Sequence, residues 1–229
     1  MEHPVMILVW VLEKLGFGHF AHTYPHLIYT WFLALVLIVA GRLATRHVTM
    51  IPGPMQNFFE AIVESMGKFQ ESIMGRHGRP FFPLICTLIM FVFLCNFNGM
   101  VPGGFAPTSN LNTTLALALT IVCTTHITGI RVHGWRYIKH FLGPSPYLIP
   151  LLFPVELISH LARVLSLSLR LFGNIMGEDL VVAILFMLGG QFFLPLPMMF
   201  LGLFTGFLQA FIITLLAMVY ISEALEHSH

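Results

Sequence analysis

The sequence has few charged residues. Lysine, arginine, aspartate and glutamate make up 9% of its 229 residues, whereas soluble domains carry about 25%. Hydrophobic residues make up 57%, a balance that is typical of proteins embedded in a lipid bilayer. The formal net charge of +1 supplies no basic surface for phosphate groups, which excludes nucleic acid as a partner.

The motifs of nucleotide, metal and cofactor sites are missing as well. The Gly67-Lys68 pair is followed by Phe69 instead of serine or threonine, and Ile62 stands where a phosphate-binding loop needs its first glycine. The three cysteines form no CxxC pair and lie within apolar runs, at Cys86, Cys95 and Cys123. We therefore predict no nucleotide site, no cofactor, no metal and no enzymatic activity of this chain on its own.

Long apolar runs dominate the sequence instead. A helix needs about 20 apolar residues to cross a hydrocarbon core roughly 30 Å thick, so the runs predict an all-α, multi-pass membrane protein that forms one domain over residues 1–229. The predicted elements are a first crossing at 27–45, an interfacial helix at 54–75, a helical hairpin at 81–130, a long helix at 148–188 and a last helix at 192–225. The interfacial helix is amphipathic, because its apolar residues follow helical spacing and charges punctuate the rest.

Basic residues predict the orientation. They gather in residues 42–79 and again in 131–139, whereas the segments around residues 98–110 and 189–197 carry no lysine or arginine. By the positive-inside rule the basic segments are cytoplasmic. The N-terminus is then outside, the long helix begins at the cytoplasmic side, and the C-terminus is cytoplasmic.

One face of the long helix is polar along its length. Glu156, Arg163 and Arg170 are seven residues apart and nearly eclipse on a helix, and Asn174 follows four residues later. Further polar residues fall near this face, at Ser159, His160, Ser166 and Glu178, whereas Asp179 points away on an ideal helix. Such a face inside a membrane is expected to line water or to contact protein.

Arg170 has no acidic residue three or four positions away on its own helix, and Gln209 is the strongest polar group at depth in the last helix. An arginine at the bilayer centre costs about 2.5 to 3.5 kcal/mol on insertion scales. We infer that its counter-ion lies on another chain. The alternative is that Arg170 reaches the headgroups, which its long apolar flanks disfavour; for Arg163, nearer the helix start, reaching the interface is the favoured interpretation.

Other polar and small residues leave alternatives open. His160 is either a packing histidine or a proton carrier, and Asn174 and Gln209 are candidates to bond each other across two helices. Two glycine pairs spaced by four predict close approach of the two long helices, at Gly173 with Gly177 and at Gly202 with Gly206.

At these residues the chain resembles a known family, subunit a of the rotary (F-type) ATP synthase membrane sector. The segment SLSLRLFGNIMGEDL resembles the family's arginine-bearing helix, FLQAFIITLLAMVYISEA its last helix, and APTSNLNTTLALAL the second arm of its hairpin. The resemblance spans nearly the whole chain, and the arginine motif is highly specific.

The resemblance implies a function in coupled proton transport and ATP synthesis. Arg170 matches the arginine that meets the carboxylate of each c-subunit as the c-ring turns, with the two long helices facing that ring. Glu156 matches the acid of the cytoplasmic half-channel, and either Glu178 or Asp179 that of the outer one. Polar residues implied along the path are Asn174, Gln209, His160 and Ser166. Implied partners are the c-ring, the peripheral-stalk b subunits and the lipid of a bacterial inner membrane.

Two other classes of protein compete with this interpretation. A polytopic secondary transporter also has polar groups at mid-membrane, but it predicts an internal repeat that the sequence lacks. A haem or metal membrane enzyme is suggested by the 12 histidines. Most of them, including His19, His22 and His26, are predicted in tails and loops, and only His126 and His160 are predicted to be embedded in the membrane.

Overall fold

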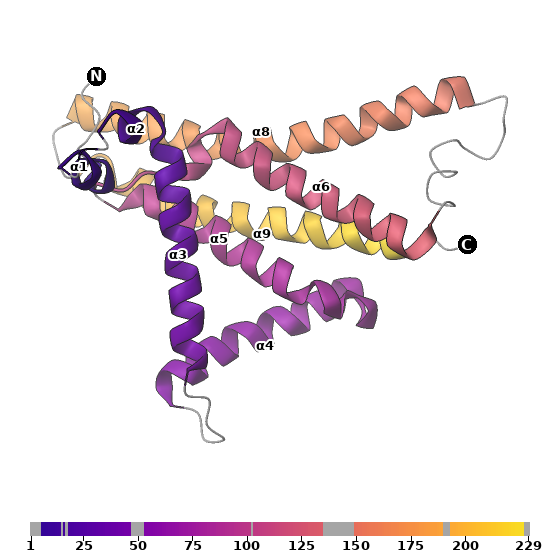
Figure 1. The fold of residues 1–229 in the computed structure, drawn as a ribbon. Coiled ribbons are helices and arrows are strands. Elements are labelled where there is room, and N and C mark those ends of the chain that lie inside the picture. Colours follow the sequence, from indigo (N-terminus) through magenta and orange to yellow (C-terminus); the bar gives the residue numbers. More distant parts are fainter. Residues whose placement is uncertain are drawn as a thin grey trace.

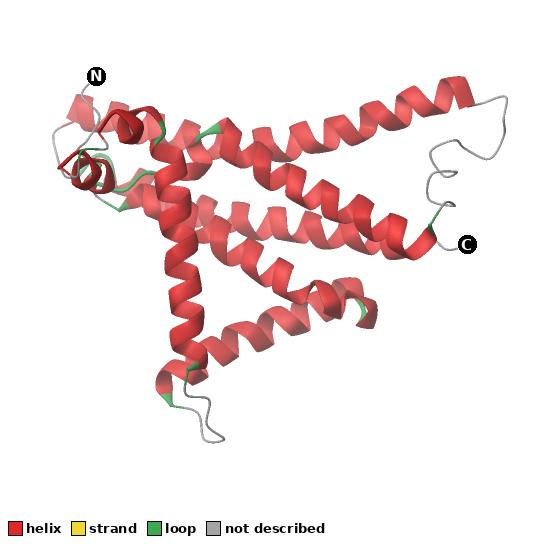
Figure 2. Cartoon of the chain, viewed as in Figure 1, coloured by secondary structure: helices red, strands yellow, loops and turns green. Residues whose placement is uncertain are grey.

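A computed structural model describes residues 6–14, 16, 18–46, 53–101, 103–134, 149–189 and 193–226. These residues are almost wholly helical and include no strand, as Figure 2 shows. The helices are α1 (Ile7–Lys14), α2 (Gly18–Thr23), α3 (Pro25–Thr45), α4 (Pro54–Met74), α5 (Phe82–Met100), α6 (Leu111–His133), α8 (Ile149–Gly189) and α9 (Leu196–Glu226), with 3-10 turns η1 (Arg76–Phe81) and η2 (Pro107–Ser109). The all-α fold predicted from the sequence is confirmed.

Five segments of the described chain are long and apolar enough to cross a membrane: α3, η1 with α5, α6, most of α8, and α9. The chain is therefore a multi-pass membrane protein. Arg136 and Lys139, used above for the orientation, lie outside the described residues.

The two long helices exceed one crossing. With a rise of about 1.5 Å per residue, the 41 residues of α8 extend over about 60 Å, twice the hydrocarbon thickness. A helix of this length must run obliquely if it is to stay within the membrane. Figure 1 shows α8 and α9 crosswise to α3, with α6 lying alongside them.

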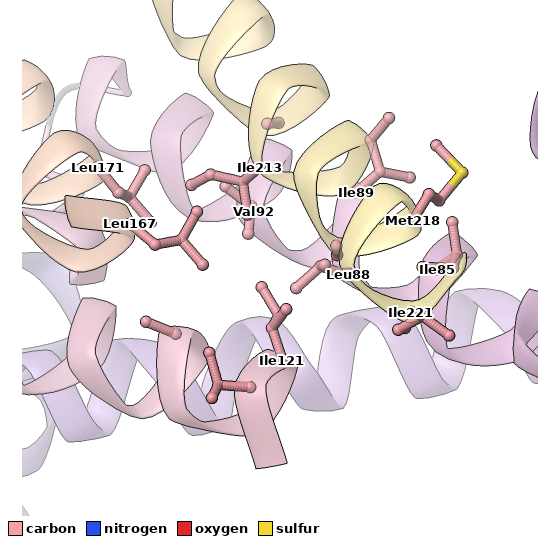
Figure 3. Close-up of a cluster of buried hydrophobic side chains, with 14 of the residues drawn as sticks. Ile85, Leu88, Ile89, Val92, Ile121, Leu167, Leu171, Ile213, Met218 and Ile221 are labelled. Atoms are coloured by element: carbon pink, nitrogen blue, oxygen red, sulfur yellow. The ribbon is translucent and has the colours of Figure 1, made fainter. Parts of the chain in front are cut away.

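The core joins α5, α6, α8 and α9, and Met74 at the end of α4 also belongs to it. Apolar side chains of α5, α6, α8 and α9 meet in one buried cluster, which Figure 3 shows around Val92, Ile121, Leu167, Leu171 and Ile213. α8 contributes a narrow row to it, Val164, Leu167, Leu171 and Ile175, whereas most of its other described side chains are at least partly exposed. Helix α8, which carries the polar face, thus packs on the other helices along one edge, while most of its remaining described surface is exposed.

Capping residues and glycines mark the ends of α4 and α6. Asn110 caps α6, because its Oδ1 accepts a hydrogen bond from the Asn112 backbone N at 3.0 Å. Gly75 and Gly134 follow α4 and α6 with φ of +61° and +55°, values that a residue with a Cβ rarely adopts. Asn110 and Gly134 thus fix where the span α6 begins and ends, and Gly75 fixes where α4 ends.

α4 is the amphipathic helix. Phe69 stacks on Phe211 of α9, with ring centroids 5.1 Å apart, while the outer side carries an ion pair between Lys68 and Glu64 at 2.7 Å. The Lys68 ammonium lowers the pKa of the exposed Glu64 carboxyl by hydrogen bonding and by charge. One side of α4 therefore packs on protein and the other carries an exposed ion pair; that α4 lies in the membrane interface stays a prediction.

Neither α1 nor α2 was predicted from the sequence. They are 8 and 6 residues long, too short for a clear periodicity, and they pack on α3 through Val9, Ala21 and Tyr29. His26, predicted in a tail or loop, lies instead in the first turn of α3 and is buried, with Nδ1 3.5 Å from Asn110 Nδ2. A proline at the helix start, Pro25, extends α3 two residues further toward the N-terminus than predicted.

A buried asparagine ties three elements together. Asn96 of α5 donates from Nδ2 to the Gly206 carbonyl of α9 at 2.9 Å, and its Oδ1 accepts from Thr108 Oγ1 of η2 at 2.8 Å. Asn96 is 6% exposed, so loss of its side chain leaves two buried polar groups without partners.

Asn96→Leu is expected to destabilise the folded chain by about 1–3 kcal/mol, the usual cost of an unsatisfied buried group. Thermal unfolding in detergent measures the change. The matched control is Thr120→Ala, whose exposed hydroxyl bonds only to Ala116 O of its own helix, at 2.8 Å. Equal melting temperatures for the two variants would contradict this role of Asn96.

Candidate functional site

The centre of the site is Arg170, on the exposed side of α8. Within the described part of the chain, its guanidinium forms no ion pair and no hydrogen bond. The sequence predicted that the chain itself offers no acid at the required spacing, and the structure agrees. A guanidinium keeps its charge at any physiological pH, so this site presents a permanent cation to whatever covers α8.

One helical turn after Arg170, a hydrogen bond between two side-chain amides joins α8 to α9. Asn174 Nδ2 donates to Gln209 Oε1 at 2.9 Å, which is the hydrogen bond that the sequence suggested. Gln209 is 3% exposed, and its Nε2 has no hydrogen-bond partner in the described structure. This buried donor, next to Asn174, is available to an acceptor on a partner or to a water molecule.

Beyond these amides lie two acids. Glu178 Oε2 accepts a hydrogen bond from Thr205 Oγ1 of α9 at 3.1 Å. Asp179 is exposed and lies within hydrogen-bonding reach of the Ser109 hydroxyl of η2, beside Glu178. The two carboxyl groups thus face different elements, Glu178 toward α9 and Asp179 toward the turn before α6.

Gly202 makes room for Glu178. A Cβ built on Gly202 would overlap the Glu178 carboxylate and would come within 2.7 Å of the Met100 methyl group. The Glu178 carboxylate of α8 therefore occupies the space that a side chain at position 202 of α9 would fill. Together, Glu178, Asp179, Thr205 and Ser109 form what we call the outer cluster.

On the other side of Arg170, toward the start of α8, lies a second set of titratable groups, the inner cluster. His160 Nε2 is 3.4 Å from Glu156 Oε1, and the His160 and His126 rings lie edge to face with centroids 4.7 Å apart. Arg163 Nη2 is 3.7 Å from Glu223 Oε2, and its guanidinium lies over the Tyr220 ring at 4.3 Å. The cluster joins α6, α8 and α9.

Arg163 was expected to reach the membrane interface, and this stays a prediction; in the structure its guanidinium pairs with Glu223 and lies over the Tyr220 ring of α9. One other expectation is wrong for the described structure. Gly173 and Gly177 were expected to allow close helix approach, but nothing lies within 4 Å of a Cβ built on either one. They lie on the exposed side of α8 together with Arg170 and Ser166.

Several residues of the site were not found from the sequence. Their partners lie on other helices, and spacing within one helix cannot show contacts between helices. These residues are Ser109, Thr205, Tyr220 and Glu223. Within the described chain, no group of three histidine, cysteine or acidic side chains is placed to hold a metal ion.

The fold and the site define a class. The chain is a polytopic α-helical membrane protein. Arg170, which is exposed and forms no ion pair with any described residue, lies along α8 between two titratable clusters. Proton-exchanging groups separated by a fixed positive charge are suited to moving protons in two separate steps.

Comparison with known proteins identifies the family. Residues 27–222 match the family described as ATP synthase A chain. Relatives named ATP synthase subunit a are 52% identical in Desulfosudis oleivorans and in Syntrophobacter fumaroxidans, and 46% identical in Citrifermentans bemidjiense, over the full length of both chains in each case. The chain belongs to the ATP synthase A chain family, which confirms the resemblance drawn from the sequence and favours it over a secondary transporter.

Proposed function

We propose that this chain is the stationary proton-conducting subunit of an ATP synthase, in which two offset half-channels meet a rotating ring at Arg170. The observation that carries the proposal is the order of groups along α8: inner cluster, unpaired arginine, outer cluster. From Arg170 the rise to His160 is about 15 Å and to Glu178 about 12 Å. No carboxylate of the described chain neutralises the arginine between them.

The partner must bring a carboxylate. An exposed guanidinium on an otherwise apolar helix surface is stabilised by an opposite charge at close range. The glycines Gly173 and Gly177 leave α8 flat on this side, which lets a helix of the partner approach closely. A ring of c-subunits that carries one acid per subunit has the required chemistry, and peripheral-stalk b subunits would hold this chain still against it.

Proton transfer then follows two steps. A proton from outside reaches the outer cluster, passes Asn174 and neutralises a ring carboxylate. The neutral site can turn into lipid, whereas a charged carboxylate there would be strongly disfavoured. After nearly a full turn the site comes to the inner side, where the proton leaves by way of water past Ser166 toward His160 and Glu156.

Arg170 separates the two paths. It cannot pass a proton on, because it does not deprotonate. Its positive charge favours the ionised form of each arriving ring carboxylate and so promotes proton release there. Each proton that crosses gains about 2.3 kcal/mol per 100 mV of membrane potential, and rotation of the ring delivers this energy to ATP synthesis elsewhere in the complex.

The proposed orientation places the N-terminus outside and the C-terminus in the cytoplasm, in a bacterial inner membrane. Two experiments test the function. The tagged chain should co-purify with a ring of small proteolipids, and vesicles that hold this membrane sector should conduct protons in response to an imposed potential. Purification of a folded chain without a ring, together with vesicles that do not conduct, would contradict the proposal.

A further inference from the structure

The inner cluster contains more titratable groups than one channel acid requires. Its members are His126 of α6, Glu156, His160 and Arg163 of α8, and Tyr220 and Glu223 of α9. The proposed path uses Glu156 and His160 but gives no function to His126. Yet the His126 ring lies against His160, 4.7 Å between centroids, which places two imidazoles in contact inside a helix bundle.

Exposure is graded across this cluster. The Glu156 side chain is 41% exposed and that of His160 is 19% exposed, while His126 is intermediate. The imidazoles therefore lie between water and the interior of the bundle. Along α8, His160 is also one helical turn nearer to Arg170 than Glu156, which is about 21 Å from it by helix rise.

The chemistry of the side chains favours the imidazoles as carriers. Carboxyl groups ordinarily titrate near pH 4 and imidazoles near pH 6.5, so near neutral pH a histidine both gains and loses protons readily, whereas an exposed carboxylate holds them briefly. The nearby Arg163 is compensated by Glu223 at 3.7 Å. An imidazolium at His160 would therefore lie near the Arg163 guanidinium but also beside the Glu156 carboxylate, 3.4 Å from its Nε2.

We propose that the His126–His160 pair is the proton-exchanging group of the inner half-channel, with Glu156 stabilising its charged form. A proton that arrives through water binds a neutral ring nitrogen of the pair and gives an imidazolium. The imidazolium then releases that proton to water or to a buffer base on the cytoplasmic side and returns to its neutral form. The inference rests on the proposed function, because it assumes that protons pass this cluster.

The test uses the intact membrane sector, with ring and stalk, in vesicles under weak buffering. Proton flow driven by a potassium diffusion potential is measured against the pH on the side of the inner cluster. The variant is His126→Gln/His160→Gln, which keeps N–H groups but cannot titrate. The matched control is His133→Gln, because His133 lies on the same helix but contacts the Ala224 carbonyl at 3.1 Å instead of this cluster.

The double variant is expected to conduct at least about tenfold more slowly near pH 7 and to lose the pH dependence centred on the imidazole range. Added imidazole, a mobile proton carrier, should restore its conduction, and the control should match the native protein. If the double variant does not assemble with the ring, each single variant is expected to show the same imidazole rescue.

Two results would overturn the inference. One is a native rate and pH profile in the double variant; the other is a slow rate at every pH that imidazole does not restore, which indicates a packing role. Both apply only if the native sector conducts protons. A native sector that does not conduct contradicts the proposed function itself, so the two failures are distinguishable.

Discussion

Arg170→Lys is expected to abolish proton-driven ATP synthesis, to below about 1% of the native rate, a loss in the range seen when one essential charge-stabilising donor is removed. Lysine keeps the positive charge but replaces a planar fork of donors with a single ammonium group. In a site with little water the ammonium can also lose its proton, which removes the barrier between the two clusters. The measurement is ATP synthesis by inverted membrane vesicles energised by respiration.

The control for this variant is Arg42→Lys. Arg42 lies in the last turn of α3, is exposed, and belongs to neither cluster. It should leave synthesis unchanged, and ring co-purification should be the same for both variants. A vesicle preparation in which Arg170→Lys synthesises ATP at the native rate would show that the arginine has no special function.

Gly202→Ala is expected to slow proton conduction about 5- to 150-fold, because overpacking costs roughly 1–3 kcal/mol and acts here on Glu178, the proposed channel acid. The new methyl group would occupy the position of the Glu178 carboxylate. That carboxylate must then leave Thr205, its hydrogen-bond partner on α9. Passive proton flow through the membrane sector measures the effect.

Two further variants make this prediction specific. Gly41→Ala is the matched control, since nothing lies within 4 Å of a Cβ built on this glycine of α3. The double exchange Gly202→Glu/Glu178→Gly returns a carboxylate to the same space from the opposite helix, and it should recover part of the lost conduction. Native conduction in Gly202→Ala would mean that the position of Glu178 is unimportant for proton access.

The sequence predicted the parts of the structure that depend on one helix at a time. Apolar runs gave the spans, and seven-residue spacing placed Glu156, Arg163 and Arg170 on one polar face. The absence of an acid near Arg170 among the described residues could also be predicted, because the membrane-embedded parts of the sequence contain so few acidic residues. These features follow from helix periodicity and from the cost of charge in lipid.

Apart from the Asn174–Gln209 hydrogen bond, the contacts between helices at the site could not be predicted in the same way. The partner of Arg163, Glu223, lies 60 positions later in the sequence, and no periodicity relates the two residues. Likewise, the sequence does not distinguish Gly202 from the other glycines. Only the structure shows that the Glu178 carboxylate occupies the space where a side chain at this position would lie. The outer and inner clusters are products of packing, which single-sequence patterns do not encode.

The central claim is that the counter-ion of Arg170 belongs to a rotor. The most direct measurement is an electron cryo-microscopy structure of the intact membrane sector with its ring. The account predicts that a ring carboxylate approaches the Arg170 guanidinium to within about 4 Å, the range of an ion pair. A guanidinium bound instead to an acid of this same chain, or turned to the lipid headgroups with the ring in place, would contradict it.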